Sequence, residues 1–146
     1  MDDKDRKILQ LLQQNAKLRI DQMARRTGIA ATTVHSRIKG MEKKGIITGY
    51  TAVVDNEKLG KPVEAYILVT VDYSMLKRAK LSQPDLGRRL KGIEGVEEAC
   101  LIAGEKDLVL RVRAESIKRL SSTITDRIRR VEGVEKTITL IVLERV

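Results

Sequence analysis

Residues 20–50 read IDQMARRTGIAATTVHSRIKGMEKKGIITGY, and this stretch decides the fold of the first third of the chain. Three of its apolar residues stand at i, i+4 and i+7, the spacing of one face of an α-helix. They are Val34, Ile38 and Met41. The spacing predicts a helix over residues 31–44, which Gly45 ends by adopting a left-handed backbone conformation.

Two shorter helical patterns precede this helix. Apolar residues within 3–14 recur at helical spacing, and a short second helix is expected to begin at about residues 19–21. The turn Thr27–Ile29 then leads into the third helix, because Gly28 tolerates a positive φ. Three helices with a short turn between the second and the third predict a helix-turn-helix, whose last helix enters the major groove of DNA. Residues 46–54 predict a small hairpin or an extended arm after it.

The polar side of the third helix supplies the candidate DNA contacts. With Val34 at the centre of the buried stripe, four polar residues fall on the opposite side and two more flank them. The four are Thr32, Ser36, Lys39 and Lys43, and the two are Thr33 and His35. Hydroxyl and imidazole groups suit base edges, whereas lysines suit bases or phosphates.

Arg37 lies nearer the apolar stripe, which favours a phosphate clamp or a structural ion pair. Arg25 and Arg26, which close the second helix, are candidates for contacts to the DNA backbone. The alternative is an ordinary solvated helix face.

The positive charge is concentrated near the N-terminus. The 146 residues carry 29 Lys and Arg against 20 Asp and Glu, which gives a net charge of +9. Residues 1–54 hold +6 of this charge, residues 55–62 hold none, and residues 63–146 hold +3. An excess of this kind suggests a polyanionic partner, most often nucleic acid, and the alternative is a merely basic protein. Charge and pattern together predict a DNA-binding domain over 1–54, a linker over 55–62 and a second domain over 63–146.

The composition excludes several other functions. Three tyrosines without any Phe or Trp cannot form the stacking platform of a single-stranded nucleic-acid binder. The lone Cys100 excludes an intramolecular disulfide and a cysteine zinc site, and a single histidine, His35, argues against a metal site or a hydrolytic triad. We therefore expect no catalytic residue, no metal and no required cofactor. A charged N-terminus and short apolar runs predict a cytoplasmic protein without membrane contact.

The second region alternates strands and helices. Apolar runs predict strands over 63–73, 96–103, 107–113 and 134–144, with helices near 84–92 and 116–130. A repeat supports this order, because LKGIEGVE at 90–97 matches IRRVEGVE at 128–135. Each copy ends a helix, turns on a glycine and begins a strand. Two such βαβ halves predict an α+β domain of ferredoxin-like βαββαβ topology.

The strands of this region are unusually apolar. Almost continuous apolar runs occur at 67–69, 108–110 and 140–143. Such runs indicate that both faces of the sheet are covered, although two helices can cover only one face. A second copy of the same sheet is the simplest cover for the other face, which predicts a homodimer through the C-terminal domain. The alternative is that this face packs on the N-terminal domain of its own chain.

These residues together resemble the Lrp/AsnC, or feast/famine, family of transcriptional regulators over essentially the whole chain. The strongest match is RIKGMEKKGIITGYTA at 37–52, which continues through Asp55 to Leu59 and Gly60. It follows the family's run of Arg, spaced apolar residues, Glu and then Gly-Ile-Ile-x-Gly-Tyr. The second match is GEKDLVL at 104–110, which is similar to the family's Gly-x-x-Asp turn between strands two and three.

The resemblance implies a winged helix-turn-helix followed by an effector domain, often called RAM. It also implies dimers that assemble into tetramers or octamers and bind an amino acid between effector domains. The effector-binding residues that it implies are Gly104, Glu105, Lys106, Asp107, Thr139 and Leu140. Backbone N–H groups of a glycine turn suit a carboxylate, and Asp107 suits an α-ammonium group, although the same four residues could form only a hairpin turn.

Two positions depart from the family pattern. Ala30 stands where the family usually has a serine at the start of the recognition helix, and alanine cannot cap a helix. Thr32 or Thr33 is then the candidate for the missing acceptor or phosphate contact. Lys106 stands where an aromatic residue usually precedes the aspartate, which predicts a changed effector preference.

The leading hypothesis is therefore a sequence-specific regulator that binds a pseudopalindromic DNA site as a dimer. An architectural DNA-wrapping protein with little sequence preference is the main alternative, and it predicts steep salt dependence and long footprints. Siroheme decarboxylases share the architecture, which makes an enzyme the third possibility. The only histidine lies on the predicted DNA face, and this placement argues against haem chemistry.

Overall fold

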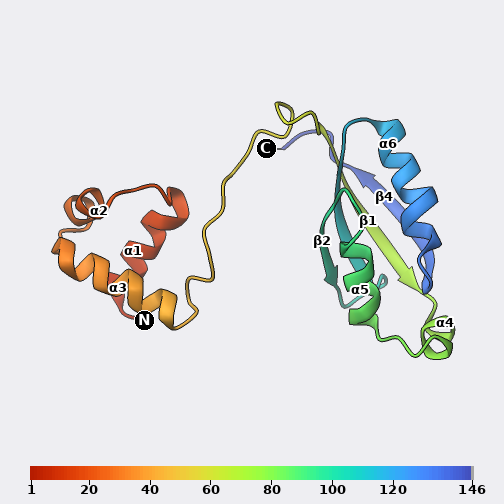
Figure 1. Cartoon of the computed structure of the whole chain (residues 1–146), viewed down its shortest axis with the longest axis horizontal. Coiled ribbons are helices and arrows are strands. Elements are labelled where there is room, and N and C mark those ends of the chain that lie inside the picture. The colour runs from red at the N-terminus through yellow and green to blue at the C-terminus, as the bar shows by residue number, and fades with distance from the viewer. Residues whose placement is uncertain (146) are drawn as a thin grey trace. The chain divides into compact units, whose positions relative to one another are not determined.

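The computed structural model describes residues 1–145. The chain divides into two compact units, of which the first spans Met1–Val53 and the second begins at Val54 (Figure 1). Within the described residues no helix is long and apolar enough to span a bilayer. Each unit has its own aliphatic core.

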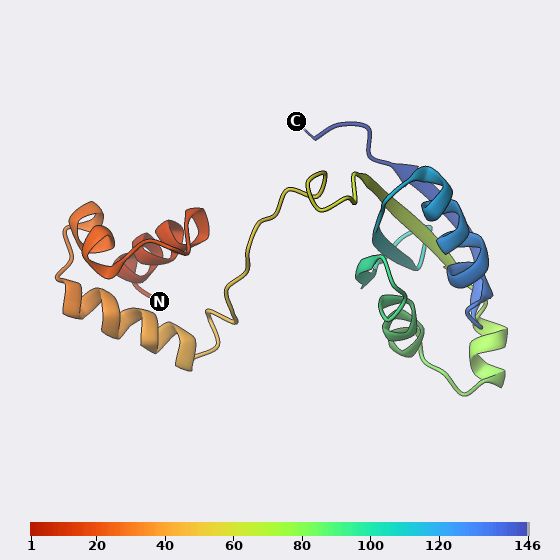
Figure 2. The same cartoon turned by 45° about the horizontal axis from the view of Figure 1, so that its top comes forward.

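The first unit consists of three helices, α1 (Asp3–Gln14), α2 (Ile20–Thr27) and α3 (Ala31–Lys43) (Figure 2). Their apolar faces meet in one cluster. It contains Ile8, Leu12, Met23, Ile29, Val34, Ile38 and Met41. The helical periods predicted from the sequence are thus confirmed, since the three residues that define the α3 stripe are all buried.

Glycine forms the turns that the helix-turn-helix requires. Gly28 has a φ of +69° at the end of α2, where its N–H donates to the Ala24 carbonyl oxygen at 2.9 Å. Gly45 has a φ of +68° just after α3. Both values lie in the left-handed region, which costs glycine little and other residues more. The sequence predicts either a hairpin or an extended arm after α3. Residues 46–53 form an extended arm without strand pairing.

The second unit is a four-stranded antiparallel sheet with its helices on one face (Figure 1). The strands are β1 (Val63–Val71), β2 (Val96–Leu101), β3 (Leu108–Ala114) and β4 (Val134–Ile141), and they lie in the order β2-β3-β1-β4. The helices α5 (Gln83–Lys91) and α6 (Ile117–Ser122) connect them as crossovers. This is the βαββαβ arrangement predicted from the repeat.

Several bounds in the second unit differ from the prediction, since β2 and β4 end at Leu101 and Ile141 rather than at 103 and 144. The first strand ends at Val71 rather than at 73, because Asp72 accepts a hydrogen bond from the Met75 N–H and caps a short helix, α4 (Tyr73–Arg78). The predicted helix over 116–130 is helical but not uniform. It runs as α6, then a π-helical stretch (Thr123–Arg127), then a 3₁₀ turn (Ile128–Arg130). Thr125 donates its hydroxyl to the Ser121 carbonyl oxygen in this stretch, and threonine bonds of this type disturb an α-helix.

The glycine before the strand has a turn conformation in both copies of the repeat, as predicted. Gly95 and Gly133 adopt φ values of +91° and +103° immediately before β2 and β4. The position three residues earlier differs between the copies, because Gly92 has an ordinary helical conformation and its counterpart is Arg130. Only the glycine directly before each strand, Gly95 or Gly133, is therefore required by the backbone.

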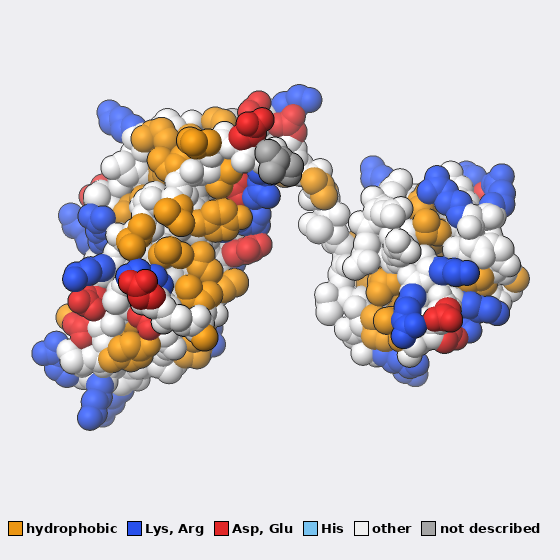
Figure 3. All heavy atoms as spheres, turned by 180° about the vertical axis from the view of Figure 1, so that it is seen from behind, with side chains coloured by type: hydrophobic (Ala, Val, Ile, Leu, Met, Phe, Trp, Pro, Cys, Tyr) orange, Lys and Arg blue, Asp and Glu red, His pale blue; other side chains and the backbone are white. Residues whose placement is uncertain are grey.

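One face of the sheet packs on the helices and the other lies open. Alternate residues of β1 and β3, such as Ile67 and Leu110, are completely buried under the helices. Their neighbours Leu68 and Val109 face the other way and are half-buried. On β4 the same open face carries Ile138 and Leu140, which are 45% and 50% exposed. Figure 3 looks at this face, over which apolar side chains gather.

Candidate nucleic-acid interface and ligand site

The exposed side of α3 carries the polar residues selected from the sequence. Helical geometry turns them away from the stripe that packs on α1 and α2. Thr32, His35, Ser36, Lys39 and Lys43 are exposed, and Thr33 is half-buried. The hydroxyl of Ser36 donates to the Thr33 carbonyl oxygen at 3.1 Å, and its lone pairs remain available as acceptors.

The backbone at the start of α3 is open to an anion. Ala30 is the residue before the helix and provides no side-chain cap, as the sequence indicated. The nearby hydroxyl of Thr27 accepts from the Ile29 N–H at 3.3 Å and donates to the Met23 carbonyl oxygen, so it does not cap α3 either. The first N–H groups of a helix carry partial positive charge and bind phosphate oxygens readily.

A carboxylate connects α3 to the extended arm. Glu42 accepts from the Tyr50 hydroxyl at 2.9 Å and from the Lys39 ammonium at 3.2 Å. These two bonds hold the pKa of Glu42 below its ordinary value. Partial burial, together with the bond to Glu42, raises the pKa of Tyr50. Neither Glu42 nor Tyr50 stands out in the sequence as a site residue, because nothing in the helical pattern shows that the arm returns to this position.

Arg37 forms a structural ion pair, which is one of the two roles that its position in the helix favours; the other is a phosphate clamp. Its Nη1 lies 2.6 Å from Asp2 Oδ2 and 2.8 Å from Asp5 Oδ1, at the N-terminus of α1. The same carboxylates form a capping box, in which each accepts the backbone N–H of the other at 2.9 Å. The backbone N–H of Asp5 and then Arg37 lower the pKa of Asp2 to about 2, and the pKa of Asp5 is lowered by its equivalent partners. Arg37 therefore ties α3 to α1.

The two arginines at the end of α2 differ in their partners. The guanidinium of Arg25 lies 2.5 Å from Asp21, one turn earlier on the same helix, and both side chains are exposed. Arg26 forms no ion pair with any residue of 1–145. An exposed pair of this kind contributes little to stability, so it holds Arg25 only weakly.

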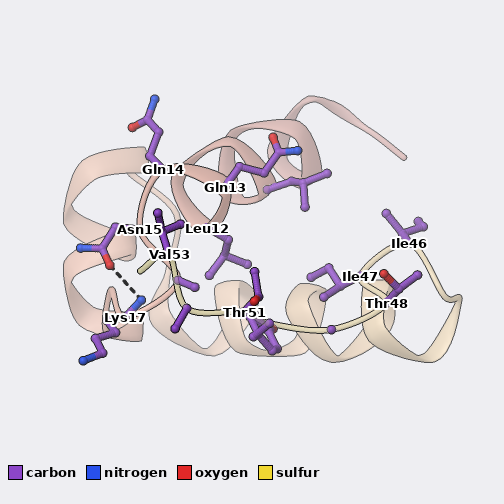
Figure 4. A pocket seen from close by; sticks show the side chains of 15 residues that line it. Leu12, Gln13, Gln14, Asn15, Lys17, Ile46, Ile47, Thr48, Thr51 and Val53 are labelled. Atoms are coloured by element: carbon purple, nitrogen blue, oxygen red, sulfur yellow. Dashed lines mark hydrogen bonds between the residues drawn. The ribbon is translucent and has the colours of Figure 1, made fainter. Parts of the chain in front are cut away.

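A groove lies between α1 and the arm (Figure 4). Its volume is about 560 Å³, and it is lined by the end of α1, the loop 15–17 and the arm 46–53. Apolar side chains such as Leu12 and Ile47 face it. The groove lies on the side of the arm rather than on the exposed face of α3.

In the second unit the turn Gly104–Asp107 is held by its aspartate. Asp107 accepts from the Val71 N–H at 2.8 Å and from the Tyr73 hydroxyl at 2.6 Å, and Gln83 donates to the same hydroxyl at 3.0 Å. The bond to Asp107 raises the pKa of Tyr73. These bonds use two of about four acceptor positions of the carboxylate, so the group can still accept from an ammonium ion. Gly104 adopts a φ of +150° and exposes its backbone.

The implied effector residues are not all gathered at one point of the single chain. Lys106 lines a hollow of about 390 Å³ together with Thr70, Lys136 and Ile138. Thr139 lines a different hollow beside α6, of about 300 Å³. Leu140 pairs with Tyr66 and lies on the open face of the sheet, because successive residues of a strand point to opposite faces. Glu105 is exposed and lies 3.7 Å from the Lys106 ammonium.

Comparison with known proteins accounts for both units. Residues 1–48 match the family model of a winged helix-turn-helix DNA-binding domain, and residues 64–146 match that of the Lrp/AsnC ligand binding domain. The chain belongs to the Lrp/AsnC family. It is a helix-turn-helix transcriptional regulator of the Lrp/AsnC type, and the matches do not favour the alternative of an architectural DNA-wrapping protein.

Curated relatives of the Lrp/AsnC chain include regulators of Pyrococcus species. An uncharacterized HTH-type transcriptional regulator of Pyrococcus horikoshii is 35% identical over 97% of this chain and 91% of its own. The HTH-type transcriptional regulator LrpA of the same organism is 32% identical, over 99% of this chain and 98% of its own.

Solved Lrp/AsnC structures share the fold over nearly the whole length. AsnC of E. coli superimposes with a TM-score of 0.85 at 28% identity and covers 99% of this chain and 93% of its own. A feast or famine regulatory protein of M. tuberculosis, solved in complex with L-methionine, has a TM-score of 0.85 at 30% identity and covers 99% and 92%. The predicted family and fold are therefore confirmed.

Proposed function

We propose that this Lrp/AsnC regulator reads the major groove of duplex DNA with α3. The observation that carries the proposal is the exposed polar face of α3 opposite its buried stripe. Thr32, Thr33, His35 and Ser36 would face base edges, whereas Lys39 and Lys43 would contact bases or phosphates. Arg25 and Arg26 would contact the backbone from α2. Arg37 would act by holding α3 against α1 and would reach a phosphate only by leaving Asp2.

Salt dependence tests the role of the two lysines. The double variant Lys39→Ala, Lys43→Ala should bind DNA more weakly, and the slope of log K against log salt should fall by up to ~2, at about 0.9 for each phosphate contact that is lost. A gel-shift titration at several salt concentrations, with competitor DNA, measures both quantities. The matched control Lys4→Ala, Lys7→Ala removes two exposed charges from α1. A slope that stays unchanged in the first variant, or that falls equally in both, would show that α3 is wrongly oriented.

The second unit would bind an amino acid as an effector. Support comes from the match to a ligand binding domain, from the relative solved with L-methionine, and from a glycine turn whose backbone and aspartate suit the two charged groups of an amino acid. The contacting residues would be those of the turn 104–107 together with Thr139 and Leu140. Because these two groups lie apart in one chain, a site that uses both would need residues from more than one subunit.

The open face of the sheet would form a homodimer. Ile138, Leu140, Leu68 and Val109 leave an apolar surface there, which is unusual for a surface in contact with water. Dimers of this kind would assemble further into tetramers or octamers, as the family resemblance implies. Each predicted domain would have its own function. Residues 1–54 would bind DNA, residues 55–62 would form a linker, and residues 63–146 would bind the ligand and form the assembly. The protein would act by binding, without catalysis and without a required cofactor.

A further inference from the structure

The charges of the second unit are divided unequally between its helical segments and the rest of the unit. Residues 63–146 carry 16 basic and 13 acidic residues. The helical segments 73–91 and 117–130 hold eleven of these basic residues and only two of the acidic ones, a net charge of +9. The strands and turns hold the remainder, a net charge of −6. The modest total of +3 therefore conceals a strongly basic helical side.

All eleven basic residues of this side are exposed, and we call them the basic helical layer. It consists of Lys77, Arg78, Lys80, Arg88, Arg89, Lys91, Lys118, Arg119, Arg127, Arg129 and Arg130. Three of them have carboxylate partners within residues 1–145: Arg88 with Asp85 at 2.7 Å, and Arg119 and Arg127 with Glu94 at 3.6 and 3.2 Å. Exposed pairs of this type contribute little energy and exchange easily for another anion.

One carboxylate links the turn after α5 to the α6 segment. Glu94 lies in the turn that follows α5, and its two arginine partners lie on α6 and the π-helical stretch. Glu94 thus holds the turn after α5 against two basic residues of the α6 segment. Figure 3 views the opposite face, and there the blue side chains project from the rim rather than from the centre.

The open face is balanced by contrast. Its buried Glu64 pairs with Arg113 at 3.0 Å and with Arg145, and Arg145 lowers the pKa of Glu64. Arg111 pairs with Glu98 at 2.8 Å. A partly apolar face whose arginines are paired with carboxylates can meet a second copy of itself, whereas helical segments with a net charge of +9 would repel one. The basic helical layer would then point outward in the dimer.

We propose that the basic helical layer binds the phosphate backbone of duplex DNA beyond the groove that α3 reads. This inference rests on the proposed function of α3, which brings DNA to the same chain. The chemistry of the layer is guanidinium and ammonium, which contact phosphates independently of base sequence. Tyr73 is the single aromatic residue of the two helical segments, and its hydroxyl is bonded to Asp107 and Gln83. Single-stranded RNA is bound by stacking successive bases on several aromatic rings, so a duplex fits the layer better. The linker keeps the two units on one molecule, and binding at α3 therefore raises the local concentration of DNA phosphates near the layer.

Neutralising one residue on each helical segment tests the proposal in the full chain. Arg89→Gln, Arg130→Gln removes two exposed charges that form no ion pair within residues 1–145. On a duplex several helical turns longer than the recognised site, the slope of log K against log salt should fall by up to ~2, at about 0.9 per contact. On a duplex that covers only the recognised site the slope should stay unchanged. Arg89→Lys, Arg130→Lys should restore the wild-type slope on the long duplex.

The control Lys58→Gln, Lys61→Gln removes two exposed charges from the linker region instead. An equal fall in this control would overturn the inference, because net charge alone would then explain the effect. An unchanged slope of log K against log salt for the Arg89→Gln, Arg130→Gln variant on long DNA would also overturn the inference. The proposal for α3 would still stand in that case if the Lys39→Ala, Lys43→Ala variant lost slope on both duplexes. A loss seen only with single-stranded RNA would overturn the choice of duplex DNA. Wild-type protein that binds no duplex at all would refute both proposals.

Discussion

The glycine that precedes β4 offers a sharp test of how the second unit is held together. Gly133 has a φ of +103°, and a Cβ at this position would lie 2.5 Å from Leu76 Cδ2 and 3.3 Å from Leu76 Cγ. Leu76 is only 3% exposed, so its side chain has little space into which to rotate. The Gly133 carbonyl oxygen also accepts from the Asp72 N–H at 2.9 Å, which holds the backbone in place.

Gly133→Ala should therefore destabilise the second unit. The backbone conformation costs an alanine roughly 1–3 kcal/mol. Crowding against Leu76 adds about 1–3 kcal/mol. The two costs sum to about 2–6 kcal/mol, and even about 3 kcal/mol accelerates hydrogen exchange through global opening by about a hundredfold, since each 1.4 kcal/mol is a factor of ten.

Amide hydrogen exchange of β1 and β4 measures this effect in the second unit alone. Gly92→Ala is the matched control, because Gly92 has a φ of −73° and the equivalent position of the repeat carries Arg130. The control should be neutral or should slow exchange slightly, by the equivalent of up to ~1 kcal/mol. Equal exchange rates in the two variants would refute the reasoning from backbone conformation and from contact with Leu76.

Three further predictions follow from the sites described above. Because the pKa of Asp2 is lowered to about 2 by the capping box and Arg37, the stability contributed there is complete above the ordinary value of 3.8 and is lost as the pH falls toward 2. Thermal melts of the first unit should show this loss in the wild type and a weaker one in Arg37→Gln; identical pH profiles would contradict it. A thermal-shift screen over the twenty amino acids should give a higher melting temperature with the effector, because a ligand that binds only the folded state stabilises it. The shift should shrink in Asp107→Asn, and a full shift in that variant would remove Asp107 from the site. Leu140→Asp should convert the dimer into monomers in sedimentation experiments by burying a charge at the interface, whereas Val53→Asp, at a side chain that is 98% exposed in the first unit, should not. A dimer that survives Leu140→Asp would show that the open face is not the interface.

Local pattern was sufficient for most of the fold. The apolar spacing of α3, the positive φ of Gly28 and the paired glycines of the repeat each depend on residues a few positions apart, so they could be predicted from the sequence. The exceptions are also local but weaker. Asp72 ends β1 early by capping α4. The Thr125 hydroxyl bonds to the Ser121 carbonyl oxygen where the 117–130 helix becomes π-helical. Both effects compete with a strand or helix pattern of similar strength.

The candidate sites were predictable only as sets of residue types. Helical periodicity selects the exposed side of α3, but it shows neither the bond from Tyr50 to Glu42 nor which role Arg37 adopts. The Gly-x-x-Asp pattern selects the turn 104–107. The partners of Asp107 lie 34 and 36 residues away in the chain and depend on how β1 and β3 align.

The sequence by itself determined the two-part plan, the helix-turn-helix and the membership of a family, because periodicity and turn chemistry are properties of neighbouring residues. Only the tertiary structure decided how charge is distributed in the second unit. Counting along the chain gives +3 for residues 63–146 and assigns the DNA contact to the first 54 residues. The crossover connections place α5 and α6 on the same face of the sheet and leave the acidic strand residues to pair with arginines on the other. The basic blocks of the sequence thereby come to lie on one face of the sheet, and an electrostatic surface depends on that placement.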